Sequence, residues 1–297
     1  MEEKRMFAAV KIQPNKKLNW LYAFLLPFIV QLVLDIGFIV AAVLLHMAQI
    51  FLPTDVIGLV DPLVLQLLVF ALPFVMILLW VRFVERRPVA GLGLYKEGMV
   101  KELSKGLVVG VVLISAVVLS QWLTGAIELT KTHFSLWNLL HLFLVFPFWF
   151  LQSATEELST RGWLFPSVAR RTSLPLGLAA SSLLFALLHL GNDGIGLIPL
   201  LNIALFGFFA CLYVLQTDNI WGISAIHATW NCFQGTVFGV NVSGIPISSS
   251  LMRFSPTSDP TYLSGGVFGA EGSIFASVIL SIACAYLAWK LYKNRVS

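Results

Sequence analysis

The chain has 297 residues, of which 58% are hydrophobic and only 11% are charged. Average soluble proteins carry about 25% charged residues, so this chain lacks the polar side chains that a water-exposed surface requires. The composition excludes an ordinary cytosolic enzyme, a disordered regulator and a nucleic-acid-binding module. The net charge of +4 does not indicate a nucleic-acid partner, because the basic residues flank apolar runs rather than lining one polar face. The surplus hydrophobic surface is expected to face lipid.

Apolar runs long enough to cross a bilayer recur along the chain. A membrane-spanning helix needs about 20 apolar residues, and helices are expected because lipid cannot satisfy free backbone groups. We predict an all-α, polytopic membrane protein in which residues 1–297 form one domain, a single bundle of about eight spans. The predicted spans are 19–50, 63–84, 105–123, 135–161, 174–190, 195–216, 221–240 and 272–292.

Lys and Arg are distributed unevenly between the two ends of these spans. With the N-terminus in the cytoplasm, all of the 19 basic residues except Lys131 and Arg253 fall on the cytoplasmic side. Because cytoplasmic loops carry the excess of Lys and Arg, we predict a multi-pass protein of the cell membrane with both termini cytoplasmic. Residues 1–18 then form a basic cytoplasmic segment, residues 85–104 a cytoplasmic connector, and residues 241–271 the longest external loop.

Ionisable side chains inside a span are costly and therefore mark candidate functional residues. The fourth predicted span contains two adjacent glutamates, Glu156 and Glu157, followed by Arg161. Glu157 and Arg161 are four residues apart, which places them on one helical face with the acid first, the better order for an ion pair. Adjacent residues on a helix point about 100° apart, so Glu156 is left free for chemistry. The alternative is a helix end whose charges are simply solvated.

Three further polar side chains are expected near Glu156. The fourth and fifth spans form an antiparallel hairpin that turns near residues 170–173, and Glu156 and His189 each lie about 22–24 Å from that turn at 1.5 Å per residue. In the seventh span, His227 and Asn231 are four residues apart and share a face. A lone histidine on an apolar face is more often a hydrogen-bonded core residue. A His–Asn pair that faces a glutamate and a second histidine is harder to explain in that way.

These residue types suit the hydrolysis of a peptide bond. A buried glutamate can act as a general base toward water, and a nearby histidine can share the proton. His227 and Asn231, as hydrogen-bond donors, suit the negative charge that develops on an attacked carbonyl oxygen. Glu156, His189 and His227 could instead hold Zn²⁺, because histidine nitrogen and glutamate oxygen are ordinary zinc ligands. The residues alone leave both alternatives open.

The order of these motifs resembles that of the CAAX-protease and bacteriocin-processing (CPBP) family of intramembrane proteases, which includes CAAX prenyl proteases and Abi-like proteins. The motifs are Glu-Glu-x-x-x-Arg at 156–161, Phe-x-x-x-His at 185–189 and His-x-x-x-Asn at 227–231. They lie on successive predicted spans within about residues 135–240, which we take as the catalytic core. The stretch 269–273 is also similar to bacterial members.

The resemblance implies an intramembrane endopeptidase that is either glutamate-dependent or metal-dependent. It implies that Glu156 and His189 activate the water and that His227 and Asn231 stabilise the oxyanion. It also implies that the site is supported by Glu157, Arg161 and Phe185. We favour the water-activating glutamate, with zinc as an optional cofactor. The expected partners are a peptide or membrane-protein substrate and the lipid bilayer.

Two other classes of membrane protein compete with a protease. A non-catalytic immunity or regulatory partner of the same fold would be favoured by degraded motifs, whereas the motifs here are intact. A transporter would use the buried Glu and His side chains as a proton relay. Transporters often show internal repeats and broken helices in corresponding halves, and this sequence shows neither.

Overall fold

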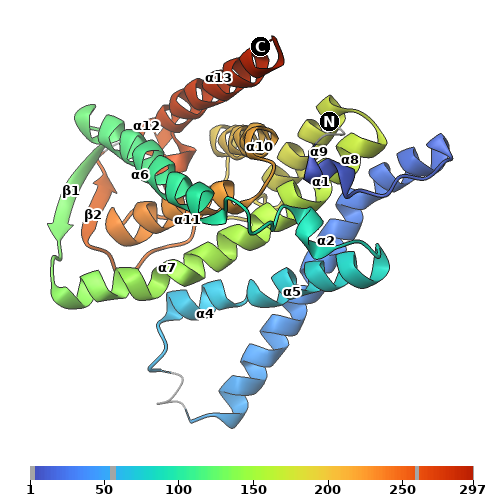
Figure 1. Ribbon diagram of the computed structural model, residues 1–297. Helices are drawn as coiled ribbons and strands as arrows, with labels where there is room; N and C mark the ends of the chain where they lie inside the picture. Colours follow the sequence, from blue (N-terminus) through green and yellow to red (C-terminus); the bar gives the residue numbers. More distant parts are fainter. Residues whose placement is uncertain (1–3, 54–57, 258–260, 297) are drawn as a thin grey trace.

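The computed structural model describes residues 4–53, 58–257 and 261–296. For residues 295 and 296 it describes the backbone alone. The predicted N-terminal segment 1–18 and the predicted loop 241–271 each lie partly outside these described ranges. Helices dominate the rest, as predicted, and they pack into one bundle (Figure 1). The first short helix and the end of the last helix lie toward the same side of this bundle. That this side is cytoplasmic stays a prediction.

The helices and strands have the following bounds in chain order: α1 Arg5–Ala8, α2 Lys16–Phe51, α4 Pro62–Leu68, α5 Ala71–Leu79, α6 Met99–Leu123, β1 Ile127–Thr132, α7 Leu136–Glu157, α8 Phe165–Arg171, α9 Leu174–Leu187, α10 Leu197–Thr217, α11 Trp221–Cys232, β2 Met252–Pro256, α12 Thr261–Ser264 and α13 Ile274–Val296. Turns of π-helix extend α5, α7 and α11 over Trp80–Val84, Leu158–Leu164 and Phe233–Val237, and short 3₁₀ turns cover Val89–Leu92 and Ala270–Gly272.

Six helices of the described ranges are long and apolar enough to cross a membrane, and they match the first four, the sixth and the eighth predicted spans. The fifth predicted span forms α9, whose 14 residues extend about 21 Å at 1.5 Å per residue, less than the hydrocarbon core of about 30 Å. The seventh forms α11, which is also short and has every residue after its first buried. The two predicted spans that form short helices are therefore the two that contain the motif histidines, His189 and His227.

The predicted end of the fourth span at residue 161 is wrong. The helix continues through a π-helical stretch and α8 to Arg171, giving one helical segment over Leu136–Arg171. The reason is that Arg161 is fully buried and paired with Glu157 inside the bundle. A charged side chain that is paired in this way does not mark the membrane surface.

Two short strands contradict the all-α prediction. Strands β1 and β2 pair in an antiparallel arrangement, with Ile127 opposite Pro256 and Thr132 opposite Met252, at the left edge of the molecule in Figure 1. A hairpin is recognised from sequence by a tight turn between neighbouring strands, and these strands lie in distant parts of the chain. The pairing ties the segment after α6 to the predicted external loop.

Two glycines of α6 set the position of α11. A Cβ atom at Gly110 would lie 2.6 Å from the carbonyl oxygen of Ile226, and a Cβ at Gly106 would collide with another backbone carbonyl of α11. Glycine at these positions allows the close backbone approach that is typical of helix packing in membranes. This contact fixes the helix that carries the third motif.

Replacing Gly110 by valine should lower the melting temperature of the detergent-solubilised protein. The added side chain has to push α6 away from α11, and overpacking of this kind costs about 1–3 kcal/mol. The matched control is Gly191→Val, because a Cβ at Gly191 would meet nothing within 4 Å. Equal melting temperatures for the two variants, measured by thermal unfolding, would show that the α6–α11 approach does not need glycine.

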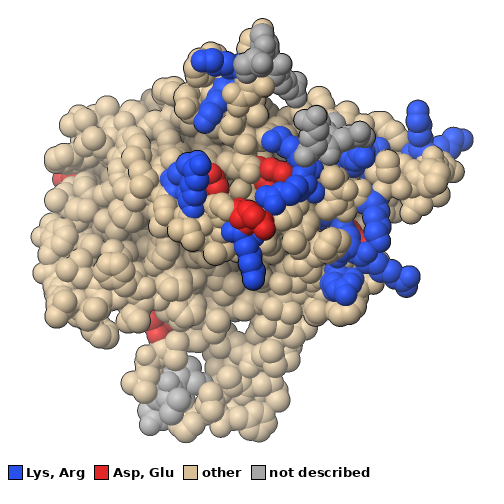
Figure 2. Space-filling model, viewed as in Figure 1, with Lys and Arg blue, Asp and Glu red and all other residues tan. Residues whose placement is uncertain are grey.

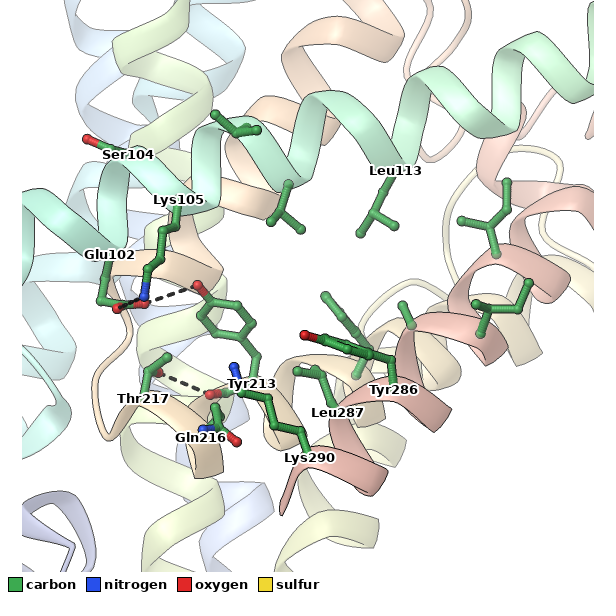
Figure 3. Close-up of a pocket in the computed structure, with 16 residues that line it drawn as sticks. Glu102, Ser104, Lys105, Leu113, Tyr213, Gln216, Thr217, Tyr286, Leu287 and Lys290 are labelled. Carbon is green, nitrogen blue, oxygen red and sulfur yellow. Dashed lines mark hydrogen bonds and ion pairs between the residues drawn. The ribbon is translucent and has the colours of Figure 1, made fainter. Parts of the chain in front are cut away.

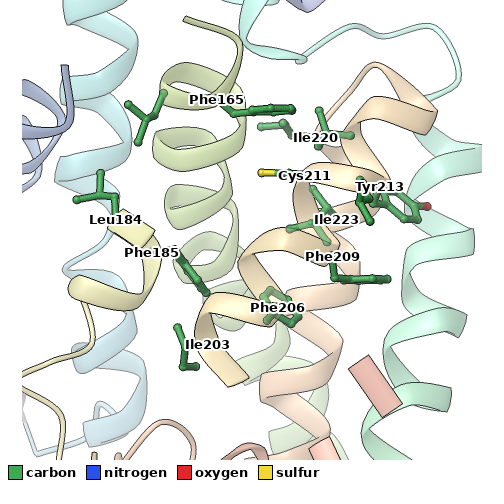
Figure 4. Packing of buried hydrophobic residues seen from close by; sticks show 14 of the residues in the cluster. Phe165, Leu184, Phe185, Ile203, Phe206, Phe209, Cys211, Tyr213, Ile220 and Ile223 are labelled. Atoms are coloured by element: carbon green, nitrogen blue, oxygen red, sulfur yellow. The ribbon is translucent and has the colours of Figure 1, made fainter. Parts of the chain in front are cut away.

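Aromatic side chains from α9 and α10, including Phe185, Phe206 and Phe209, pack in the hydrophobic core beside α11 (Figure 4). The ring centroid of Phe206 lies 6.0 Å from that of Phe185 and 5.0 Å from that of His227. Phe209 continues the stack along α10, 6.1 Å from Phe206. The ring of His227 therefore packs against apolar aromatic rings on this side.

Candidate active site

The four side chains predicted to be catalytic line one cavity of about 390 Å³. Glu156 comes from the end of α7, His189 from the turn after α9, and His227 and Asn231 from consecutive turns of α11. His189, His227 and Asn231 are each less than one-tenth exposed, and the side chain of Glu156 is 16% exposed. The predicted meeting of these residues is therefore found in the structure, while their catalytic roles stay predictions.

Glu157 joins the first motif to the third. Its buried Oε1 atom lies 3.3 Å from Nη1 of Arg161 and accepts a hydrogen bond of 2.9 Å from Nδ1 of His227. The four-residue spacing predicts the first contact, and the structure confirms it; the second contact joins different helices and has no such signal. A carboxylate only accepts hydrogen bonds, so Nδ1 of His227 carries the proton. Nε2 is then the ring nitrogen of His227 that is left for other contacts in the cavity.

Phe185 supports three motif residues at once. The guanidinium carbon of Arg161 lies 4.2 Å from the centroid of the Phe185 ring, a cation–π contact that suits a buried arginine. The same ring lies 4.9 Å from the ring of His189 and 5.9 Å from that of His227. Arg161 itself lies in the π-helical stretch after α7, a distortion that frequently occurs at functional sites. These contacts account for an aromatic residue at the start of the second motif.

Glu156 presents one carboxylate oxygen that lacks a hydrogen-bond donor. Its Oε1 atom accepts a hydrogen bond of 2.6 Å from Nε2 of Gln152. Its Oε2 atom lies 3.7 Å from Nε2 of His227 and is shielded from solvent without a hydrogen-bond partner in the described part of the chain. Leaving a buried acceptor unsatisfied is costly. A donor such as a water molecule in the cavity would therefore bind favourably at this atom.

Gln152 is a residue of the site that the sequence interpretation missed. Its Oε1 atom accepts hydrogen bonds of 3.0 Å from Nδ2 of Asn231 and of 3.0 Å from the hydroxyl of Ser153. Gln152 therefore holds Glu156 and Asn231 in fixed relative positions across two helices. The available signal was a buried amide one helical turn before Glu156, at the spacing of residues that share a helix face.

His189 is oriented by the backbone of its own motif. The Nδ1 atom donates a hydrogen bond of 2.8 Å to the carbonyl oxygen of Phe185, because a carbonyl oxygen can only accept. In the neutral imidazole this bond leaves Nε2 without a proton, as an acceptor. The fixed four-residue spacing of the second motif thus selects one tautomer of its histidine.

Glu271 is a second buried carboxylate beside the site. One of its oxygens accepts a hydrogen bond from the hydroxyl of Ser243 and the other a bond of 3.3 Å from the indole nitrogen of Trp230. It also lines a small chamber of about 20 Å³ together with His189 and His227, which is room for one water molecule. Burial raises the pKa of the Glu271 carboxyl, and the Ser243 hydrogen bond opposes that shift. The sequence interpretation gave Glu271 no role.

The described ranges contain no group of three or more His, Cys, Asp or Glu side chains arranged to hold a metal ion. The alternative zinc ligands, Glu156, His189 and His227, line the same cavity without forming such a group. Nδ1 of both histidines is already engaged within the protein. Nε2 is therefore the nitrogen of each histidine that could still contact a metal ion.

Comparison with protein families places the three motifs in one known group. Residues 134–233 match the family described as Rce1-like type II CAAX prenyl endopeptidase. This chain carries an Rce1-like region. The region includes all three motifs, and the resemblance inferred from them is thereby confirmed. Comparison with curated proteins and with solved structures finds no match. Gln152 lies inside the Rce1-like region and Glu271 lies outside it.

Proposed function

We propose that this protein is an intramembrane endopeptidase that hydrolyses a peptide bond with a water molecule activated by Glu156 and His189. The strongest support is the Oε2 atom of Glu156, which is buried without a hydrogen-bond donor from the part of the chain that the structure describes, in the cavity that His189, His227 and Asn231 also line. The Rce1-like region supports the same class of reaction, because the family is described as endopeptidases.

The first step forms a tetrahedral intermediate. Glu156 takes one proton from the water molecule while the water oxygen bonds to the carbonyl carbon of the peptide. The second hydrogen stays on the water oxygen and donates a hydrogen bond to Nε2 of His189, which is free to accept because the Nδ1 proton is held by the carbonyl oxygen of Phe185. This hydrogen bond orients the attacking oxygen. The electron pair of the carbonyl double bond moves to the carbonyl oxygen, which becomes an oxyanion.

His227 and Asn231 then stabilise the oxyanion. Asn231 gives one amide hydrogen to Gln152 and keeps the other for the substrate. His227 donates from Nε2 in its protonated form, and the carboxylate of Glu157 at Nδ1 stabilises that cation. The carbon–nitrogen bond breaks when the intermediate collapses, and Glu156 returns its proton to the leaving amine.

The substrate that we propose is a peptide or a segment of a membrane protein. The cavity has apolar walls from α2 and α4 that include Phe38 and Leu67, and such walls suit apolar side chains or an attached isoprenoid. A prenylated C-terminal peptide is the first class to test, because the matched family is described as prenyl endopeptidases. We also propose that the protein acts in the cell membrane, as a multi-pass protein.

The proposal is tested with a panel of quenched fluorescent peptides, prenylated and unprenylated, added to purified protein in detergent. Cleavage of at least one peptide by the wild-type protein and not by Glu156→Gln is the expected result. The competing classes, a non-catalytic immunity or regulatory partner and a transporter, predict no cleavage by either protein. Equal cleavage by both proteins would contradict the proposed role of Glu156.

Chelation should leave the cleavage rate unchanged, because the proposed reaction needs no metal. The measurement is cleavage before and after treatment with EDTA or 1,10-phenanthroline, together with elemental analysis of the purified protein. Stoichiometric zinc whose removal stops cleavage and whose return restores it would establish the alternative. Glu156, His189 and His227 would then be the ligands to test.

A further inference from the structure

A groove that the proposed reaction does not use opens between α6, α10 and α13 (Figure 3). Its volume is about 1010 Å³, at the upper end of the range of about 300–1,000 Å³ for small-molecule sites. None of the candidate catalytic side chains lines it. Side chains of α13 at its edge, including Ile282 and Tyr286, are more than half exposed. The groove is therefore open on the side where the bundle is expected to meet lipid.

The lining of the groove has a polar end and an apolar end. In Figure 3, Lys105, Tyr213 and Lys290 lie toward one end, and Leu113 of α6 points into the space toward the other. The apolar wall is formed mostly by valine, leucine and isoleucine side chains from α6 and α13, with Phe209 of α10 and Ala283 of α13. This division matches the two parts of a membrane lipid, a polar headgroup and hydrocarbon chains.

Hydrogen-bonding groups are left over at the polar end. Glu102 is already satisfied, because it accepts hydrogen bonds from Lys105 at 2.8 Å and from the hydroxyl of Tyr213 at 3.2 Å. The Oε1 atom of Gln216 is shielded and has no donor among the described residues. In the same described ranges, the ammonium group of Lys290 has no acceptor. Lys290 therefore suits an anion, Lys105 has further N–H donors beyond its ion pair with Glu102, and Gln216 suits a hydroxyl group.

The polar end also lies at the basic end of the bundle. Lys105 is near the start of α6 and Lys290 near the end of α13. Figure 2 shows the Lys and Arg side chains gathered over one part of the visible face, while most of the remaining surface carries no charge. Basic pockets between membrane helices on the cytoplasmic side bind anionic lipid headgroups. The polar end of the groove thus lies at the level along the bundle where we expect a lipid headgroup, and its apolar end lies at the level of the acyl chains.

We propose that this groove binds an anionic glycerophospholipid whose headgroup carries free hydroxyl groups. Its phosphate would contact Lys105 and Lys290, a headgroup hydroxyl would donate to Oε1 of Gln216, and an acyl chain would lie along the apolar walls of α6 and α13. The site is separate from the proposed catalytic cavity, so the proposal does not depend on proteolysis.

The test measures lipid binding by native mass spectrometry of the detergent-purified full chain, with phosphatidylglycerol and phosphatidylcholine as probes. The wild-type protein should retain one phosphatidylglycerol in preference to phosphatidylcholine. Lys105→Gln with Lys290→Gln should weaken phosphatidylglycerol binding about 25-fold, because each lysine beside an anionic headgroup contributes a factor of about five. The matched control is Lys16→Gln with Lys17→Gln, two exposed lysines at the start of α2 that do not line the groove.

Further variants make the result decisive. Ala283→Trp should also abolish binding, because Ala283 lines the groove and the larger side chain would occupy the space of the acyl chain. Inorganic phosphate should not compete, which separates a lipid site from a simple anion site. If the double lysine variant unfolds, Lys290→Gln alone carries the test. Equal binding of phosphatidylglycerol by the groove variants and the α2 control, or equal binding of both lipids by the wild-type protein, would overturn the proposal.

Discussion

Replacing Glu156 by glutamine should lower the rate of peptide cleavage by about 10²–10⁴-fold, the usual contribution of a general base. Glutamine has nearly the same size and can still accept the hydrogen bond that Gln152 donates to Oε1. Its amide cannot take a proton from water at the position of Oε2, the carboxylate oxygen that has no donor among the described residues. The expected loss is therefore in kcat, with the melting temperature unchanged.

The control for this experiment is Glu97→Gln, which removes an exposed carboxylate of the connector between α5 and α6. That variant should cleave at the wild-type rate. His189→Ala should lose activity as Glu156→Gln does, because the water would lack its second hydrogen-bond partner. A Glu156→Gln or His189→Ala protein that folds and cleaves within a few-fold of the wild-type rate would remove that residue from the mechanism.

The sequence predicted helix bounds best for long apolar helices whose length is set by the thickness of the bilayer. The predicted span 19–50 forms α2, Lys16–Phe51, because its apolar run is long and holds only a few polar residues, of which Gln31 and Asp35 bond to each other. The predicted span 135–161 ends before the observed segment Leu136–Arg171 does, because Arg161 is buried and does not mark the membrane surface. Strand pairing between β1 and β2 was missed entirely. Charge and hydropathy report exposure to lipid or water, and they do not report partners from distant parts of the chain.

The candidate site was predictable to the extent that its contacts are local. The Glu157–Arg161 ion pair follows from spacing within one helix. The hydrogen bond from His227 to Glu157 and the bridge made by Gln152 cross between helices, so no periodicity reports them. Glu271 precedes the last span after a loop without a regular pattern, and only the three-dimensional packing places it beside the histidines.

Removal of Arg161 should destabilise the protein by about 3–5 kcal/mol, the usual cost of breaking a buried ion pair from one side. Arg161 and Glu157 are both fully buried and lie 3.3 Å apart. In Arg161→Ala, Glu157 would keep its hydrogen bond from His227 but lose its permanent cation. The measurement is the melting temperature in detergent, and Arg82→Ala, which removes an exposed arginine, is the control and should change it little.

A second substitution separates lost charge from lost packing. If the uncompensated carboxylate causes the damage, Glu157→Gln added to Arg161→Ala should recover part of the stability, because a neutral amide costs less to bury than a charge. It should not recover cleavage, since glutamine at 157 cannot stabilise a protonated His227 as a carboxylate does. A double variant no more stable than Arg161→Ala would assign the cost to the lost contact with Phe185. Recovery of stability without activity would show that an unpaired buried carboxylate at position 157 destabilises the fold and that cleavage needs the intact Glu157–Arg161 pair.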